Sequence, residues 1–411
     1  MRFWKKLLPG LRPQDATTRR SLICFWILVF AAMPVWIAVD TSGWDVAIYH
    51  SAMNALAMGH DPYSDATAIQ KLIHTQGLQP GQEPPYSYVY SPVTLPLLRL
   101  ISRGPATFSA ACYWVVYVAA LLTQVWIGLM ATMRAEKKYF LWIAAVTPFF
   151  PGFLGSGIVL GGNVAVILYA AVFFTALIGW KSDTWRWFYL AVICASCVKA
   201  PLLGLLAIPV LSARKQWIPA GAAALAGIAL FALQPLIWPS LFRHYLEAVD
   251  LQFRYNRDFG MSPAGLFSGV LWDHKLPYSP ASFIFFLGYA VPLFVFLVYL
   301  SRQFQQRAFS LKEWIPLLMV GVILLNPRIM EYDVAPLALP MALIAWRVIA
   351  RIARPHRTLL VFSLFFVACN LFAFLGWERW KIAEGALLVV FFVAGSWDLL
   401  QRAKEQRVLL T

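Results

Sequence analysis

Three charged residues in this sequence have the type and the placement for chemistry: Asp45, Lys199 and Arg328. Asp45 lies just after the first long apolar run, at the start of a helix that we expect from about Gly43 to Met58. A carboxylate held there could accept a proton as a general base. It could also simply satisfy first-turn amides and complement the helix dipole. A helix start lowers the pKa of a carboxylate, which would weaken Asp45 as a base.

Lys199 and Arg328 are candidates for holding an anion. Lys199 lies inside an apolar run, where a charge is costly and is by default a functional candidate. The alternative is that it snorkels toward an interface, because Pro201 breaks the helix nearby. The planar guanidinium of Arg328 suits a phosphate group. The alternative is a structural ion pair between Arg328 and Glu331 or Asp333.

The elements that position these residues must be membrane helices. The chain has 411 residues, of which 60% are apolar and only 13% charged, and its mean hydropathy is +0.66. A soluble protein would be about half apolar and a quarter charged. Most of the 34 basic residues, against 19 acidic ones, lie in short segments between apolar runs. This positive-inside pattern indicates a polytopic membrane protein and excludes nucleic acid as the expected partner.

Runs of about twenty apolar residues predict about twelve transmembrane helices. They lie near 22-39, 90-102 (a short run), 106-132, 139-158, 163-180, 187-211, 217-238, 281-301, 313-327, 333-350, 358-376 and 382-400. Residues 1-21 are basic and are expected in the cytoplasm, followed by a single membrane domain over 22-411. In this arrangement the basic clusters at 134-138 and 181-186 lie outside. Both clusters lie on the cytoplasmic side instead if the 90-102 segment is re-entrant and 187-213 is a hairpin.

Two polar segments, at about 40-90 and 239-280, are too long for tight turns, and we expect both to be folded on the extracytoplasmic side. In the second, charged residues from Arg243 to Arg254 recur at helical spacing, which most simply indicates a solvated face with internal ion pairs. The sequence has no His-x-x-x-His or Asp-x-Asp pair, and hard-cation sites gather several oxygens. We therefore expect no metal and no cofactor.

Five short motifs, taken in order, resemble glycosyltransferase family 87, the polyprenol-phosphate-mannose-dependent mannosyltransferases with a GT-C fold. They are Asp45-x-x-x-Tyr49 through Gly59-x-Asp61-Pro62-Tyr63, then Tyr88-Val-Tyr90-Ser91-Pro92, Gly161-Gly162-Asn163, Lys199-Ala200-Pro201, and Asn326-Pro327-Arg328 with Glu331-Tyr332-Asp333. Ser91 stands where the family has its first proline. The last motif replaces the Ser-Pro and paired histidines of the mycobacterial branch, which leaves the sugar and the acceptor open.

The resemblance implies a GT-C fold and transfer of a sugar, mannose or another hexose or pentose, from a polyprenyl-phosphate donor. The acceptor is a hydroxyl of a lipid or polysaccharide, the reaction inverts, and Asp45 is the general base. The implied donor-binding residues are Tyr49, Tyr63, Tyr90, Asn163, Lys199, Arg254, Asn256, Arg328, Glu331, Tyr332 and Asp333. The expected location is the inner membrane of a bacterium, with the site on the periplasmic side. The alternative is a transporter or flippase of lipid-linked sugars, although the sequence lacks the repeated halves typical of transporters.

Overall fold

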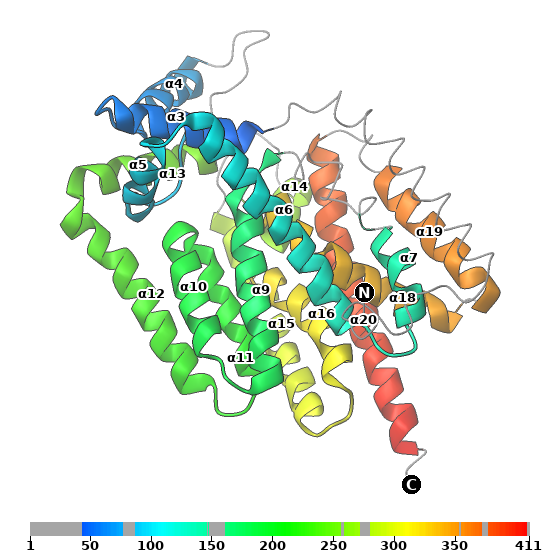
Figure 1. The fold of residues 1–411 in the computed structure, drawn as a ribbon. Coiled ribbons are helices and arrows are strands. Elements are labelled where there is room, and N and C mark those ends of the chain that lie inside the picture. Colours follow the sequence, from blue (N-terminus) through cyan, green and yellow to red (C-terminus); the bar gives the residue numbers. More distant parts are fainter. Residues whose placement is uncertain are drawn as a thin grey trace.

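The computed structural model describes residues 43-76, 87-145, 147, 161-255, 259-271, 280-352, 355-371 and 377-408. Within these residues the fold is all-α, and the only β-type pairing is an isolated bridge between Gly260 and Ile329 (Figure 1). Several of the helices are long and apolar enough to cross a membrane, so the chain is an all-α membrane protein.

The described α-helices are α3 (Trp44–Ala57), α4 (Ser64–Gln76), α5 (Leu95–Ser102), α6 (Ala106–Ala131), α7 (Phe140–Ala145), α9 (Val164–Ser182), α10 (Arg186–Val198), α11 (Ala207–Ser212), α12 (Trp217–Ile237), α13 (Pro239–Tyr255), α14 (Pro263–Leu271), α15 (Pro280–Gln305), α16 (Leu311–Leu324), α17 (Glu331–Val334), α18 (Ala338–Ile352), α19 (Pro355–Leu371) and α20 (Trp377–Val408). Short 3-10 helices are η1 (Pro92–Thr94), η2 (Lys137–Tyr139), η4 (Ala200–Leu206) and η5 (Ala335–Leu337).

Six helical segments in the described residues have the length and composition of a membrane span. They are Thr107–Ala131, Val164–Ser182, Trp217–Ile237, Ile284–Gln305, Glu331–Ile352 and Ala383–Glu405. The predicted count of about twelve is therefore not confirmed. The first predicted run, 22-39, and the second half of the 139-158 run lie outside the described residues.

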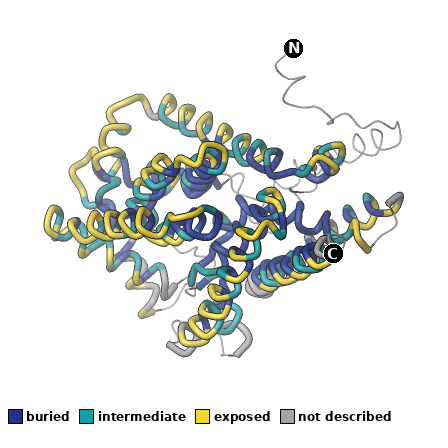
Figure 2. The backbone as a smooth tube through the Cα atoms, turned by 90° about the horizontal axis from the view of Figure 1, so that it is seen from below, coloured by how far each residue is buried: buried dark blue, intermediate teal, exposed yellow. Residues whose placement is uncertain are grey.

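Helices α16 and α18 form the centre of the bundle, because their side chains are buried along nearly the whole of α16 and most of α18. The outer helices α6, α12 and α15 instead expose large apolar side chains such as Leu122, Ile218 and Val291. Figure 2 shows this division, with buried positions inside and exposed positions on the outward sides of the outer helices. Exposed aliphatic side chains along a span are the surface that lipid chains cover.

The segment predicted as one span at 187-211 is a hairpin. Helix α10 ends at Val198, and the chain returns through η4 and α11 to Ser212. Ser212 accepts a hydrogen bond from Trp180 near the end of α9, so the hairpin returns to the end from which α10 started. Pro201 lies at the turn of this hairpin, where the missing backbone N–H of proline cannot continue a helix. The short run at 90-102 also does not span, because α5 has eight residues.

The basic clusters lie together at one end of the bundle, which we call the basic end. Lys312 of α16 donates to the carbonyl of Thr132 after α6 (3.0 Å), and Arg347 of α18 pairs with Glu136 (2.7 Å). Lys181 at the end of α9 lies 5.3 Å from the ring centroid of Trp126 in α6. The clusters at 134-138 and 181-186 therefore lie at the same end. This agrees with the alternative topology, in which 90-102 is re-entrant and 187-213 is a hairpin.

The opposite end carries the two predicted folded loops, and we call it the capped end. Helices α3 and α4 from the first loop and α5 from the 90-102 run lie together with α13 from the second loop at this end (Figure 1). An ion pair between Lys71 and Glu247 joins α4 to α13, and a hydrogen bond between the Asp61 carboxyl group and the His244 ring joins the α3–α4 turn to α13. The described parts of both segments are therefore helical, and α13 of the second segment packs against α4 of the first.

Candidate functional site

Helix α3 positions Asp45 at the capped end. The helix begins at Trp44 with Gly43 as its N-cap, in a left-handed conformation (φ 81°) and without a side-chain cap. One face of the helix is buried, and it comprises Asp45, Tyr49, Ala52 and Leu56. The carboxylate of Asp45 therefore points into the protein, and only 6% of the residue is exposed.

Asn163 holds the carboxylate of Asp45 in place. Its Nδ2 donates to Asp45 Oδ1 (2.9 Å), and its Oδ1 accepts from the backbone N–H of Ala165 (2.9 Å) as the N-cap of α9. Because the cap requires the amide oxygen, the nitrogen can only face Asp45. The Gly-Gly-Asn motif of the sequence thus joins the start of α9 to α3.

Gly162 is required for this approach of α9 to α3. Its φ of +74° lies in the left-handed region. A Cβ at this position would lie 2.6 Å from Val46 Cγ2 and 3.2 Å from the ring of Trp114. The residue before Asn163 is therefore glycine for both conformational and steric reasons.

Burial raises the pKa of Asp45 from 3.8 to about 7. The hydrogen bond from Asn163 and the charge of Lys199 lower the pKa but do not offset burial, and the charge of Glu331 raises it further. The sequence predicted the opposite direction, from the position of Asp45 in the first turn of a helix. That prediction is wrong because the loss of hydration outweighs the helix dipole at a residue that is nearly inaccessible to solvent.

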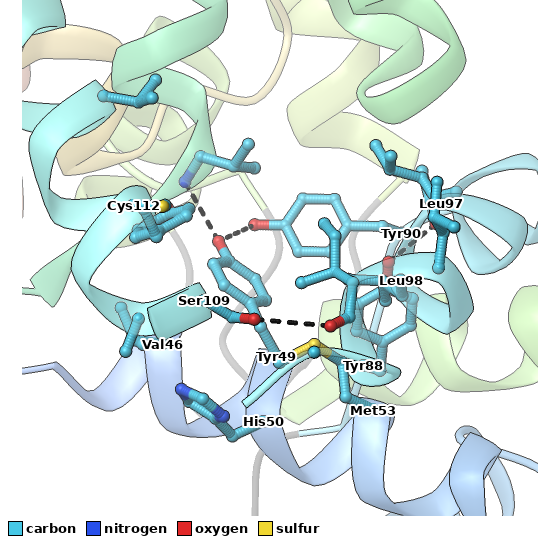
Figure 3. Close-up of a pocket in the computed structure, with 18 of the residues that line it drawn as sticks. Val46, Tyr49, His50, Met53, Tyr88, Tyr90, Leu97, Leu98, Ser109 and Cys112 are labelled. Atoms are coloured by element: carbon cyan, nitrogen blue, oxygen red, sulfur yellow. Dashed lines mark hydrogen bonds between the residues drawn. The ribbon is translucent and has the colours of Figure 1, made fainter. Parts of the chain in front are cut away.

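Buried tyrosines line up beside Asp45. The Tyr49 and Tyr90 hydroxyls are 3.0 Å apart, and Tyr49 also accepts from the backbone N–H of Val164 (3.0 Å) (Figure 3). Tyr63 donates to the carbonyl of Tyr90 (2.7 Å). Burial raises the pKa of Tyr49, Tyr63 and Tyr90 above 10, so all three are protonated at neutral pH. This hydrogen bond from Tyr63 holds the backbone of Tyr90 in place. Tyr49 and Tyr90 line an apolar cavity, whereas Tyr63 does not.

Lys199 lies between α10 and η4 and faces the protein interior. Its Nζ is 3.1 Å from Asp333 Oδ1 and 3.8 Å from the ring centroid of Tyr332. The Asp333 carboxylate also accepts from the Tyr169 hydroxyl (3.0 Å) and from the backbone N–H of Met330 (2.9 Å). Lys199 therefore does not snorkel toward an interface, because its ammonium group pairs with Asp333 instead.

The other predicted donor-binding residues have different placements. Arg328 is half-buried in the turn before α17, where its backbone N–H donates to Asn326 Oδ1 (3.1 Å), and its charge lies within electrostatic range of Tyr332. Asp333, one of its two suggested ion-pair partners, pairs with Lys199. Arg254 belongs to α13 but its side chain is outside the described part of the chain, as is the whole of Asn256.

An apolar cavity of about 550 Å³ lies against these residues. Its inner wall contains Tyr49 and Tyr90 together with Val164 and Val198, the neighbours of Asn163 and Lys199 in sequence. Its outer wall is formed by α5 and α6, with exposed apolar side chains that include Leu97, Phe108 and Val116 (Figure 3). The cavity therefore extends from the polar residues of the site toward the lipid-facing surface.

Sequence reasoning missed two residues of this region. Tyr169 is nearly inaccessible and binds Asp333, but a tyrosine inside an apolar run carries no distinguishing signal. Glu384 of α20 is fully buried, neither of its carboxyl oxygens has a hydrogen-bond partner in the described structure, and it lies within electrostatic range of Glu331. A signal was present here, because Glu384 is an acid inside the apolar run at 382-400.

Within the described residues, no group of three or more His, Cys, Asp or Glu side chains could hold a metal ion. No protein-family model, curated protein or solved structure matches this chain. The arrangement of Asp45, Asn163, Lys199 and Asp333 at the capped end is therefore the basis on which function is inferred.

Proposed function

We propose that the protein is a GT-C-type membrane glycosyltransferase that transfers a sugar from a polyprenyl-phosphate donor to a hydroxyl of a lipid or polysaccharide. One observation carries the proposal. Asp45 is a buried carboxyl with a pKa of about 7, held by Asn163 next to an apolar cavity that extends to the lipid-facing surface. A base with a pKa near the operating pH is well suited to general catalysis. The order of the five sequence motifs, which resembles glycosyltransferase family 87, supports the same chemistry.

The proposed reaction has one proton transfer and one displacement. Asp45 accepts the proton of the acceptor hydroxyl, and the oxygen forms a bond to the anomeric carbon of the sugar. The bond from that carbon to the phosphate oxygen breaks, and the electron pair leaves with the polyprenyl phosphate. Attack opposite the leaving group inverts the anomeric centre. The protonated Asp45 then returns its proton to water.

Charge at the site supports the binding of the departing phosphate. Lys199 and Arg328 both act electrostatically on Tyr332. Lys199 is held in place by Asp333 and is 15% exposed, so its position is fixed before a ligand binds. Preorganised cations stabilise charge as it develops on a leaving group.

The cavity supports a lipid-linked donor in place of a free nucleotide sugar. Its lining from α5 and α6 is mostly apolar, and the described residues of the cavity wall include no lysine or arginine. An isoprenoid chain fits such a surface, whereas the phosphates of a nucleotide sugar would require basic residues there. The sugar end of the donor would then lie near Tyr49 and Tyr90.

Charge distribution supports an extracytoplasmic site. Basic side chains gather at the end of the bundle opposite Asp45, which by the positive-inside rule is the cytoplasmic end. We therefore propose a bacterial inner membrane as the location, with the capped end on the periplasmic side. Polyprenyl-phosphate sugars are used on that side in the family that the sequence resembles.

The test is transfer by the purified full-length protein in lipid nanodiscs. We would supply a panel of radiolabelled polyprenyl-phosphate sugars with a membrane lipid extract and compare the wild type with Asp45→Asn. Transfer by the wild type, its loss in Asp45→Asn and full transfer by Asp183→Asn, an exposed acid that follows α9 at the basic end, would support the proposal. No transfer from any donor, with movement of the labelled lipid between leaflets of proteoliposomes, would replace it with the flippase.

A further inference from the structure

Helix α5 carries a second hollow on the side away from the large cavity. This hollow has a volume of about 380 Å³ and an apolar floor formed by Leu56, Leu95, Trp238 and Leu241. Two arginines form its rim, Arg99 of α5 and Arg103, which is the C-cap of that helix and keeps a helical backbone conformation. Residues four positions apart lie one above the other on a helix, so both guanidinium groups border the same opening.

The charges of Arg99 and Arg103 are not neutralised by neighbouring side chains. Both residues are exposed, and neither guanidinium forms an ion pair or a hydrogen bond with another residue of the described structure. Elsewhere in the protein, arginines pair with acids, as Arg347 does with Glu136 and Arg351 with Asp398. Two adjacent unpaired guanidinium groups over an apolar floor are complementary to a ligand with an anionic head and an apolar tail.

The hollow lies at the level of a membrane interface. Helix α5 immediately precedes the span that begins at Thr107, and Trp238 immediately follows the span that ends at Ile237. A tryptophan at a span end is a common interface anchor. The exposed side chains of Leu97 and Leu100 on α5 also fit a short helix that lies along the lipid surface. Phosphate groups of phospholipids are found at this depth.

We propose that this hollow is a binding site for an anionic phospholipid, with the phosphate on Arg99 and Arg103 and one acyl chain on the apolar floor. Two unpaired positive charges favour a headgroup with net negative charge over a zwitterionic one. The site is distinct from the proposed sugar-transfer site, since α5 separates the two hollows, and it does not depend on that function. Leu56 of α3 contributes to its floor, so a bound lipid also packs against the helix that carries Asp45.

The test is direct lipid binding to the purified full-length protein in detergent. A phosphatidylglycerol with a fluorescent acyl chain is titrated, and its anisotropy gives the affinity. We expect Arg99→Gln with Arg103→Gln to weaken binding by about tenfold or more, and each single substitution to account for part of that loss. The matched control is Arg134→Gln with Arg214→Gln, two exposed arginines at the basic end, which should bind as the wild type does. Melting temperatures show that each variant is folded.

Four results would overturn the proposal. The first is an equal loss of affinity in the control pair, which would indicate a general charge effect. The second is equal affinity for phosphatidylcholine carrying the same fluorescent chain, since a zwitterionic lipid would then satisfy the site. The third is displacement of the probe by millimolar inorganic phosphate, which would identify a free-phosphate site. Retained binding in both single variants and in the double variant would refute it as well.

Discussion

Replacing Asp45 with Asn tests the general base with little change in volume. The Oδ1 of the new side chain can still accept the hydrogen bond from Asn163, so the geometry is kept while the proton acceptor is lost. General-base catalysis contributes about 10²- to 10⁴-fold to a rate, and we expect Asp45→Asn to lower kcat by that factor. In the wild type, kcat should rise with pH and reach half its maximum at about pH 7, because only the ionised form of Asp45 accepts a proton.

The same residue makes a second prediction about stability. Burial raises the pKa of Asp45 from 3.8 to about 7, so between these values the folded state holds a proton that the unfolded state releases. The stability of the wild type therefore falls as pH rises from about 4 to about 7. The full difference is on the order of 4 kcal/mol. The Asn variant cannot ionise, so its stability should not follow this slope.

Two measurements check these expectations on the same preparations. One is the initial rate of sugar transfer from pH 5.5 to 8.5, and the other is the melting temperature from pH 4 to 8.5. The Asp45→Asn variant should become more stable than the wild type as pH rises, while remaining inactive. The control Asp183→Asn removes an exposed carboxylate at the basic end and should behave as the wild type does in both. A melting-temperature difference that does not change with pH would refute the assignment of a raised pKa, and a fully active Asp45→Asn would refute the base.

Three further substitutions test the structure around the base. Gly162→Ala is expected to lower the folding stability by about 1–2 kcal/mol because of the left-handed backbone and by about 1–3 kcal/mol because the new Cβ contacts Val46. Adding Val46→Ala to this variant should recover only the part that is due to the contact, and melting temperatures measure both effects. Lys199→Ala leaves Asp333 buried without its cation and should destabilise the protein by about 3–5 kcal/mol. The double variant Lys199→Met with Asp333→Asn removes both charges, so it should recover the melting temperature but not the affinity for the donor. Tyr49→Phe leaves the N–H of Val164 without its acceptor and should cost about 1–3 kcal/mol, whereas equal stability would show that this bond is not formed.

The sequence was sufficient for the class of protein and for the local structure of α3. Apolar runs with basic residues between them predict membrane helices because the bilayer core requires about twenty apolar residues per crossing. The spacing of Asp45, Tyr49 and Ala52 predicts one helix face because the α-helix repeats every 3.6 residues, and that face is buried in the structure. These features depend on residues that are near one another in the chain, and local physics determines them.

The number of crossings could not be obtained in the same way. The run at 187-211 is as apolar as a span, but it forms a hairpin because Lys199 pairs with Asp333, which is more than a hundred residues away, and Pro201 ends the helix. The segment at 90-102 lies along the capped end because α3 and η1 pack against α5. Hydropathy gives no information about such partners.

The chemistry of Asp45 was decided by tertiary structure alone. From sequence, a carboxylate in a first helical turn has a lowered pKa, and its neighbour in space could not be named. In the folded protein Asn163, which is 118 positions further along the chain, donates to Asp45, and the surrounding tyrosines exclude water. Desolvation depends on every atom packed around the group, most of them distant in sequence, and it is the largest contribution to the pKa of about 7.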